Sequence, residues 1–151
     1  MRNEKNNKKS NKKSKAFVFD FDETLAHTEA VELDGSEDRF AEFKDPQAVL
    51  NGTPLSLMVL AQQVYNEGHS VYILTARNNC VANAISEFLL RFEIEANAIH
   101  CVGTDAKVNI AKSKRKVLLS IIENHDIVYF FDDDEMNIEL ASKLDCRARK
   151  V

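Results

Sequence analysis

The chain has 151 residues, 44% of them hydrophobic and 29% charged, which is typical of one globular domain with a core of its own. The longest relevant apolar run, residues 127–131, is far too short to span a bilayer, and no apolar signal region follows the basic N-terminus. We therefore expect no membrane contact and a location in the cytoplasm or an equivalent compartment. Three scattered cysteines without a C-x-x-C pair predict reduced thiols.

Residues 1–15 form a basic tail made almost entirely of Lys, Asn and Ser. Seven basic residues and one acidic residue give it a charge of +6, so the net charge of −4 leaves −10 on residues 16–151. The tail has no apolar residue after Met1 and is predicted to be disordered, outside the single domain expected for residues 16–151. It is interpreted either as a solubilising terminus or as a tether to nucleic acid or another polyanion.

The first predicted strand, residues 16–20, ends in the sequence Asp-Phe-Asp-Glu-Thr at positions 20–24. Two carboxylates about 4 Å apart repel by about 4 kcal/mol near a protein surface, so such a pair tends to recruit a divalent cation, and oxygen ligands favour Mg²⁺. Side chains two residues apart on an extended chain point to the same side, so Asp20 and Asp22 can reach a common point unless the chain turns sharply between them. One can then attack while the other moves a proton.

The acidic segment 26–52 lacks a sustained pattern of either period. We predict a loop or small flap over the site, anchored on the body by Phe40 and Phe43, and too short for a separate cap domain. For the motif at 20–24 the alternatives are an acidic turn at the strand end or a calcium-binding loop. A calcium-binding loop that starts at Asp20 is disfavoured, because its sixth and twelfth positions, which need Gly and an acid, hold Leu25 and Val31.

A helix is expected at residues 54–67, with Thr53 as its cap, Pro54 as its first residue and Gly68 as its stop. A strand follows at 71–75. Thr75 closes this strand just before a helix N-terminus, where a hydroxyl can hold a phosphate oxygen. An ordinary helix-capping turn is the alternative.

A helix at 79–92, a strand at 98–102 and a helix at 114–124 come next. Lys114 lies three, four, seven and eight residues before apolar residues of the last of these helices, so it shares the buried face, in the first turn. There it can balance a nucleophilic carboxylate and bind phosphate. The alternatives are a solvated basic helix start, or Lys112 or Lys116 in this role if the helix has another register.

The apolar run 127–131 does not alternate, which predicts a central strand covered on both faces. Four acids, residues 132–135, follow it directly, and we interpret them as the second half of a metal site that Asn137 orients through Asp133. A helix at 135–144 and a strand at 145–149 complete the chain. This alternation of strands and helices predicts an α/β fold, a parallel sheet between two layers of helices.

The sequence at 20–24, Thr75, Lys114 and the pair Asp132-Asp133 resemble, in order, motifs I to IV of the haloacid dehalogenase superfamily, over nearly all of residues 16–145. The resemblance implies a Rossmann-like three-layer sandwich with a five-stranded parallel sheet in the order 3-2-1-4-5 and a minimal cap or none. It makes the protein an expected phosphatase, because motif I carries a second aspartate.

By this resemblance Asp20 is the nucleophile that forms an aspartyl-phosphate, and Asp22 is the general acid that later activates water. The expected cofactor is Mg²⁺, held by the Asp20 carboxylate, the Asp22 backbone carbonyl and the Asp133 carboxylate, with Asp132 close by.

Thr75 and Lys114 are expected to hold the transferring phosphoryl group, whose charge must be neutralised in the transition state. Arg77 is either a second phosphate contact or the partner of an ion pair with the acidic segment. The stretch Thr75-Ala76-Arg77 is similar to the phosphatase domains of bacteriophage polynucleotide kinase/phosphatases. This similarity implies a phosphorylated small molecule, such as a nucleotide, or a nucleic-acid 3′-phosphate end as substrate.

Two other functions use a similar set of residues. In a phosphorylatable signalling domain the accepting Asp ends the third strand and the Lys follows the fifth, an order that this chain does not have. A domain that keeps the fold but only binds a partner stays open. No catalytic role is assigned to the four histidines, and the sequence does not indicate an oligomeric state.

Overall fold

The structure is a computed structural model that describes residues 14–28 and 44–151. The predictions made for residues 1–13 of the tail and for residues 29–43 of the flap, including the two phenylalanine anchors, lie outside these described residues. Lys15, assigned to the tail, is the first residue of a strand.

Five parallel strands form the main sheet, in the order β5-β4-β1-β6-β7. They are β1 (Lys15–Phe19), β4 (Ser70–Thr75), β5 (Ala98–Cys101), β6 (Ile127–Asp132) and β7 (Arg147–Lys150). Counted along the chain, this is the predicted order 3-2-1-4-5. The carboxyl ends of β1 and β6 therefore lie side by side at the centre of the sheet, where the acidic segments begin.

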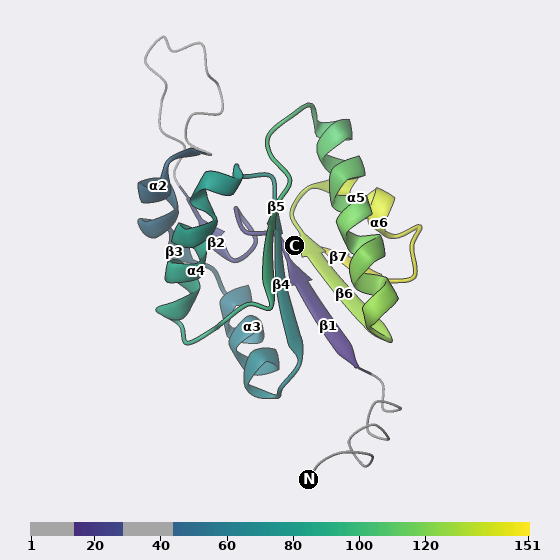
Figure 1. Cartoon of the computed structure of the whole chain (residues 1–151), viewed down its shortest axis with the longest axis horizontal. Coiled ribbons are helices and arrows are strands. Elements are labelled where there is room, and N and C mark those ends of the chain that lie inside the picture. The colour runs from purple at the N-terminus through teal and green to yellow at the C-terminus, as the bar shows by residue number, and fades with distance from the viewer. Residues whose placement is uncertain (1–13, 29–43) are drawn as a thin grey trace.

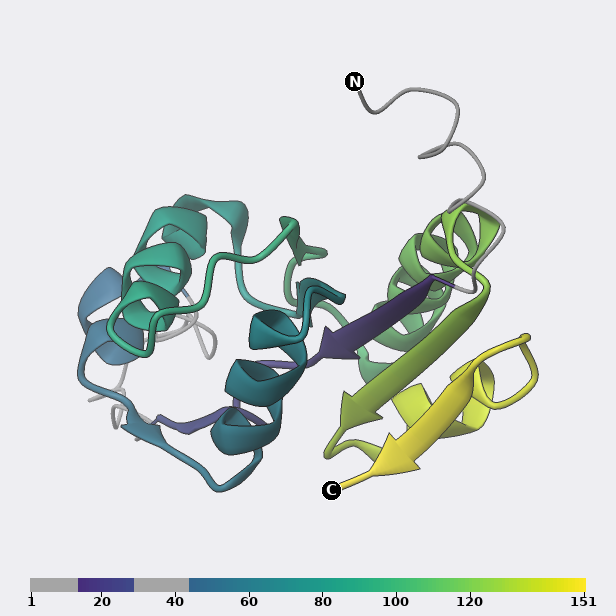
Figure 2. The same cartoon turned by 90° about the horizontal axis from the view of Figure 1, so that it is seen from below.

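Helices cover both faces of the sheet (Figure 1). One layer holds α3 (Leu57–Asn66), η2 (Asn79–Val81), α4 (Ala82–Leu90) and α2 (Pro46–Leu50), which packs on α4. The other holds α5 (Lys107–Asn124) and α6 (Glu135–Ala141). Seen from below, β1, β6 and β7 lie side by side with α5 and α6 behind them (Figure 2). The α/β three-layer prediction is confirmed.

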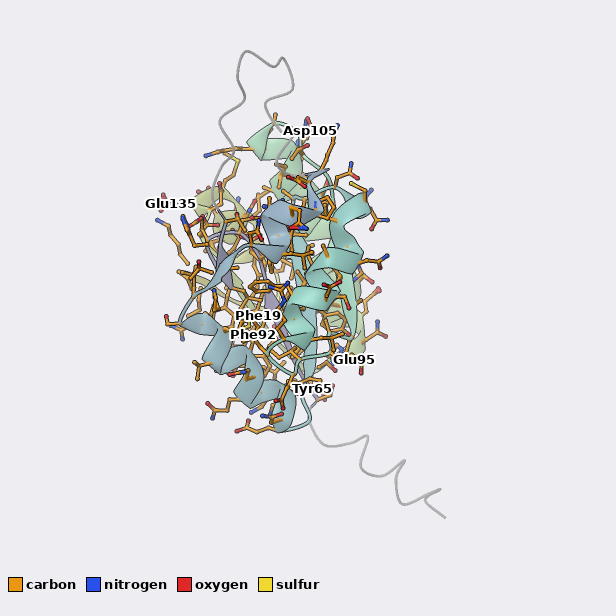
Figure 3. All side chains as sticks on the ribbon, turned by 90° about the vertical axis from the view of Figure 1, so that its left-hand side faces the viewer. Phe19, Tyr65, Phe92, Glu95, Asp105 and Glu135 are labelled. Atoms are coloured by element: carbon orange, nitrogen blue, oxygen red, sulfur yellow. The ribbon has the colours of Figure 1, made fainter. Side chains whose placement is uncertain are left out.

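The central strand β1 contributes side chains to two hydrophobic cores, because its side chains alternate between the two helical layers. Phe17 and Phe19 join the core under α3 and α4, whereas Ala16 and Val18 join the core under α5 and α6. All four are buried, which explains why a strand covered on both faces reads as an uninterrupted apolar run. Figure 3 shows Phe19 inside the molecule, while Asp105 and Glu135 lie toward one end and Tyr65 and Glu95 toward the other.

The start of α3 differs from the prediction. Thr53 and Pro54 form β3 (Thr53–Pro54), which pairs antiparallel with β2 (Ala26–His27), and the helix begins at Leu57. The Thr-Pro pair resembles a helix start locally, but in the structure these two residues pair with β2 instead. Gly68 follows the helix end with a φ of +90°, as expected for a stop.

Helix α5 begins at Lys107, seven residues before the predicted start, so Lys114 lies in its third turn rather than its first. Ala106 precedes it without a side-chain cap, which is why no start signal was visible in the sequence. The predicted helix 79–92 divides into η2 and α4, and the helix predicted to reach residue 144 ends at Ala141. Segment 26–52, expected to have no regular element, contains β2 and α2.

Within the part of the chain that the structure describes, no helix is both long enough and apolar enough to cross a membrane.

Candidate active site

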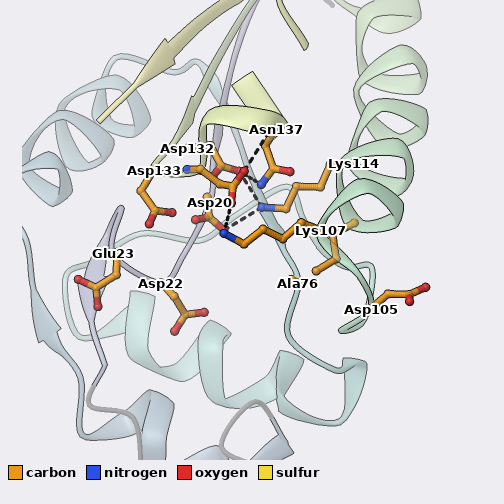
Figure 4. Close-up of a pocket in the computed structure, with 12 residues that line it drawn as sticks. Asp20, Asp22, Glu23, Ala76, Asp105, Lys107, Lys114, Asp132, Asp133 and Asn137 are labelled. Atoms are coloured by element: carbon orange, nitrogen blue, oxygen red, sulfur yellow. Dashed lines mark hydrogen bonds and ion pairs between the residues drawn. The ribbon is translucent and has the colours of Figure 1, made fainter. Parts of the chain in front are cut away.

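The chain turns sharply just after β1. The Phe21 carbonyl accepts hydrogen bonds from the amides of Thr24, Leu25 and Ala26. Phe21 and Leu25 are fully buried, so the apolar residues between the acids anchor this turn in the core. The side chains of Asp20 and Asp22, two residues apart, consequently point in different directions rather than to one common point (Figure 4). Asp20 contacts Lys114, whereas Asp22 contacts Arg77.

Lys114 joins the two halves of the predicted site. Its Nζ lies 3.0 Å from Asp20 Oδ1 and 2.7 Å from Asp132 Oδ2, and the side chains of all three residues are at least nine-tenths buried. The predicted buried orientation of Lys114 is therefore confirmed. Lys112 and Lys116, on the same helix, are exposed. The helix register thus selects Lys114 among the three candidate lysines.

Asp133 completes a cluster of carboxylates. One carboxylate oxygen each from Asp20, Asp132 and Asp133 lies within 4.8 Å of the others. Among residues 14–28 and 44–151, Asp133 forms no ion pair with a cation. Three carboxylates thus face the single ammonium of Lys114, an excess of negative charge in a set of oxygen ligands. Such a cluster fits Mg²⁺.

The pKa values of Asp20, Asp133 and Lys114 are shifted by burial and by the neighbouring charges. Burial raises the pKa of Asp20 well above its ordinary value; Lys114 opposes the rise and Asp132 adds to it. Burial also raises the pKa of Asp133. Burial alone lowers the pKa of Lys114, but Asp20 and Asp132 outweigh it, so that pKa is raised. Burial therefore raises the pKa of the two carboxyl groups, and the negative charge of Asp20 and Asp132 raises the pKa of Lys114.

Two neighbouring side chains orient this cluster. Thr24 Oγ1 donates to Asp20 Oδ2 at 3.2 Å. Asn137 is buried at the start of α6, and its Nδ2 donates to Asp132 Oδ2 at 3.0 Å. The prediction that Asn137 orients Asp133 is therefore wrong: Asn137 lies one turn after Asp133 in sequence, but its amide reaches the carboxylate that ends β6.

Asp22 is held by Arg77 and Thr28. Arg77 Nε lies 2.9 Å from Asp22 Oδ2, and Arg77 Nη2 lies 2.7 Å from Oδ1. Thr28 Oγ1 donates to Oδ1 at 2.6 Å. Of the two roles predicted for Arg77, the structure contains an ion pair, and its partner among the described residues is Asp22, the second acid of the motif.

Thr75 ends β4 and is fully buried. Its Oγ1 accepts a hydrogen bond from the Arg77 amide at 3.1 Å, so the hydroxyl takes part in the turn that carries Arg77. A pocket of about 320 Å³ opens beside the cluster. Its lining contains five of the predicted site residues, Asp20, Asp22, Lys114, Asp132 and Asp133, together with Asn137, but neither Thr75 nor Arg77.

Some residues of the site were not predicted from the sequence. Thr28 and the pocket-lining Asp105 and Lys107 belong to this group. Asp134, grouped with the metal ligands as one of four acids, caps α6 by accepting hydrogen bonds from the amides of Met136 and Asn137. An Asp placed just before a helix is a recognisable cap signal, whereas nothing in the sequence indicates Thr28.

The fold agrees with that of solved structures. No protein-family model and no curated protein matches this chain. A chain of the Pnkp1/Rnl/Hen1 RNA repair complex matches with a TM-score of 0.69 at 18% identity, covering 92% of this chain and 42% of that one. A magnesium complex of a haloacid dehalogenase family enzyme from Bacteroides thetaiotaomicron matches with a TM-score of 0.60 at 11% identity, covering 93% and 94% of the two chains.

A third match is a haloacid dehalogenase-like hydrolase from Streptococcus pneumoniae, with a TM-score of 0.54 at 11% identity, covering 89% of this chain and 83% of that one. This chain spans less than half the length of the matched chain of the RNA repair complex. At these identities the likeness concerns the fold. The chain therefore has the haloacid dehalogenase-like fold that its four ordered motifs predicted.

Proposed function

We propose that the protein is a Mg²⁺-dependent phosphatase that hydrolyses a phosphomonoester through an aspartyl-phosphate on Asp20. The observation that carries this proposal is the contact of Lys114 Nζ with both Asp20 and Asp132, at 3.0 and 2.7 Å, beside a pocket lined by a third carboxylate. A nucleophilic carboxylate that a buried cation orients, next to surplus negative charge that a metal ion can neutralise, suits phosphoryl transfer.

In the first step an Asp20 oxygen attacks phosphorus, the bond from phosphorus to the leaving oxygen breaks, and Asp22 gives that oxygen a proton. In the second step Asp22 takes a proton from water, the water oxygen attacks the same phosphorus, and the bond to Asp20 breaks. Inorganic phosphate leaves, and both carboxyl groups return to their initial states.

Other residues bind and orient. Lys114 lies next to the attacking carboxylate, so its ammonium can neutralise the phosphoryl oxygens. Arg77 orients Asp22 through two nitrogens, and its role as a second phosphate contact stays a prediction. The Thr75 hydroxyl accepts a hydrogen bond from the Arg77 amide, and its role as a contact of the phosphoryl group stays a prediction. When bound by Asp20, Asp133 and the Asp22 carbonyl, with Asp132 nearby, Mg²⁺ would supply positive charge for the phosphoryl group.

The proposed substrate is a nucleotide or a nucleic-acid 3′-phosphate end. Support comes from the similarity of the Thr75-Ala76-Arg77 stretch to polynucleotide phosphatase domains, from the basic residues 1–15, and from a fold shared with a chain of an RNA repair complex. The alternative is a domain that accepts a phosphoryl group on Asp20, or binds a partner, without hydrolysis.

The test is release of inorganic phosphate from an aryl phosphate, mononucleotides and 3′- and 5′-phosphorylated oligonucleotides, with Mg²⁺ or with EDTA. Asp20→Asn is compared with Asp145→Asn, an exposed acid on the loop before β7. We expect Mg²⁺-dependent release that falls by about 10³-fold or more in Asp20→Asn and stays unchanged in Asp145→Asn. Release that survives Asp20→Asn contradicts the mechanism. A stable phosphorylated Asp20 without turnover favours the alternative.

A further inference from the structure

The outer surface of α5 and α6 contains a basic groove next to the pocket. The groove encloses about 760 Å³, and α5 and α6 lie side by side along it (Figure 1). Its cations are Lys112, Arg115, Lys116 and Lys143, all of them exposed. Asp105 lines both this groove and the candidate catalytic pocket, so the two lie next to each other.

These four cations form no ion pair with an acidic side chain within residues 14–28 and 44–151. Lys112 lies three residues before Arg115 and four before Lys116, so the three charges share one face of α5. Like charges at these spacings destabilise a helix. The arrangement is also unlike the rest of the domain, since residues 16–151 carry a net charge of −10. A bound polyanion would neutralise this local excess of positive charge.

We propose that this groove, defined by Lys112, Arg115, Lys116 and Lys143, binds the sugar-phosphate backbone of a single-stranded nucleic acid whose phosphorylated end lies in the pocket. This inference rests on the proposed phosphatase function and adds a docking surface to it. Helix α5 supplies both sites: Lys114 points into the catalytic cluster, and its neighbours Lys112 and Arg115 line the groove. From Lys107 at the pocket to Lys116 the helix rises about 14 Å, enough for more than one phosphate.

The side chains that line the groove favour binding of a nucleic-acid backbone over binding of bases or of a protein surface. No aromatic side chain is among the described residues that line it, so it offers no platform on which bases could stack. Leu140 is its one fully apolar lining side chain among those residues, whereas the centre of a protein–protein interface is apolar. Binding should therefore be independent of base sequence and sensitive to salt.

The test compares two triple variants that each remove three exposed positive charges. The groove variant is Lys112→Gln/Arg115→Gln/Lys116→Gln. The control is Arg147→Gln/Arg149→Gln/Lys150→Gln on the edge strand β7. Circular dichroism and thermal unfolding first verify that both variants fold. If both fold, they have the same net charge, and any difference in binding comes from where the charges were removed.

The binding measurement uses the Asp20→Asn protein and a labelled single strand of roughly ten nucleotides, followed by fluorescence anisotropy over a range of salt concentrations. We expect the groove variant to bind about 10-fold more weakly or worse. The magnitude of the slope of log K against log salt concentration should fall by about 2, since three phosphate contacts are lost and each contributes about 0.7 on a single strand. Equal losses in the groove and β7 variants overturn the proposal, and so does equally tight binding to a polyglutamate of matched charge.

The kinetic measurement compares a 3′-phosphorylated oligonucleotide with a 3′-phosphorylated mononucleotide. We expect the groove variant to lower kcat/KM about 10-fold for the oligonucleotide and to leave the mononucleotide unchanged. A parallel loss on both substrates overturns the groove while leaving the phosphatase intact. If the parent hydrolyses neither substrate, the proposed function fails, and the binding measurement still decides the groove by itself.

Discussion

Arg77 and Asp22 form a two-nitrogen ion pair across 55 residues of sequence, with Arg77 Nε 2.9 Å from one carboxylate oxygen and Nη2 2.7 Å from the other. The arginine side chain is 1% exposed and the aspartate side chain 19% exposed. Planar guanidinium groups hold carboxylates in a defined orientation. The direction of the proposed general acid is therefore set by two residues outside its own motif, Arg77 after β4 and Thr28.

Replacing Arg77 should separate its effect on the orientation of Asp22 from the effect of its charge. Arg77→Lys keeps a cation but loses the two-nitrogen geometry, so we expect kcat to fall by about 10²-fold with KM little changed. Arg77→Met leaves Asp22 without this partner and should also lower the free energy of unfolding by about 3 kcal/mol. Steady-state kinetics and urea unfolding measure the two effects.

The exposed Arg91→Lys provides a control for the chemical change alone. An Arg77→Lys protein with parental kcat would show that Asp22 does not depend on this arginine for its orientation.

Removing the cation at the centre of the site should destabilise the fold. Lys114→Met leaves Asp20 and Asp132 buried without their ammonium, which should cost about 3–5 kcal/mol of unfolding free energy. Lys116→Met, on the exposed face of the same helix, is the matched control and should cost less than about 0.5 kcal/mol. Urea unfolding of both variants measures the difference.

The same variant should respond to pH and metal. Burial raises the folded-state pKa of Asp20 above its unfolded value, so protonation stabilises the fold, and this contribution is lost as pH rises through the folded pKa. We therefore expect the deficit of Lys114→Met to be smaller in mild acid than near neutrality, and Mg²⁺ to recover part of it. If the loss of unfolding free energy in Lys114→Met changes neither with pH nor with Mg²⁺, the site does not lack positive charge.

Loss of the amide that holds Asp132 should weaken metal binding. Asn137 Nδ2 donates to Asp132 Oδ2 at 3.0 Å, and removing such an orienting donor typically lowers metal affinity by about 10–100-fold. Isothermal titration of Mg²⁺ into Asn137→Ala and into the surface control Asn124→Ala checks this. Equal affinities in the two variants would place Asp132 outside the metal site.

The three thiols should differ in reactivity. Burial raises the pKa of both Cys101 and Cys146 to about 11, whereas Cys80 is exposed. At about pH 8 only a small fraction of the two half-buried thiols is ionised, so a disulfide reagent should label Cys80 rapidly and the other two slowly. Cys80→Ser should lose the fast phase, and unfolding should make all thiols equally reactive. A fast phase that persists in Cys80→Ser contradicts the assignment.

The layout of this fold was predictable because its signals are local. Apolar runs of strand length and apolar stripes of helical period predicted the five strands and the two helical layers, whereas the strand order came from the resemblance of the four motifs to the haloacid dehalogenase superfamily. The acids stand at the ends of the strands that the sheet brings together. The buried orientation of Lys114 followed from the spacing of apolar residues after it. Element ends were less predictable, since α5 begins without a capping side chain.

The sequence by itself determined which residues meet at the site, because Asp20 and Asp132 follow neighbouring strands of the sheet and Lys114 lies on the buried face of the helix packed over them. Only the tertiary structure decided which atom contacts which: Arg77 pairs with Asp22, and the Asn137 amide reaches Asp132. Such contacts depend on the reach and direction of side chains from elements distant in sequence, and periodicity and composition contain no information about either.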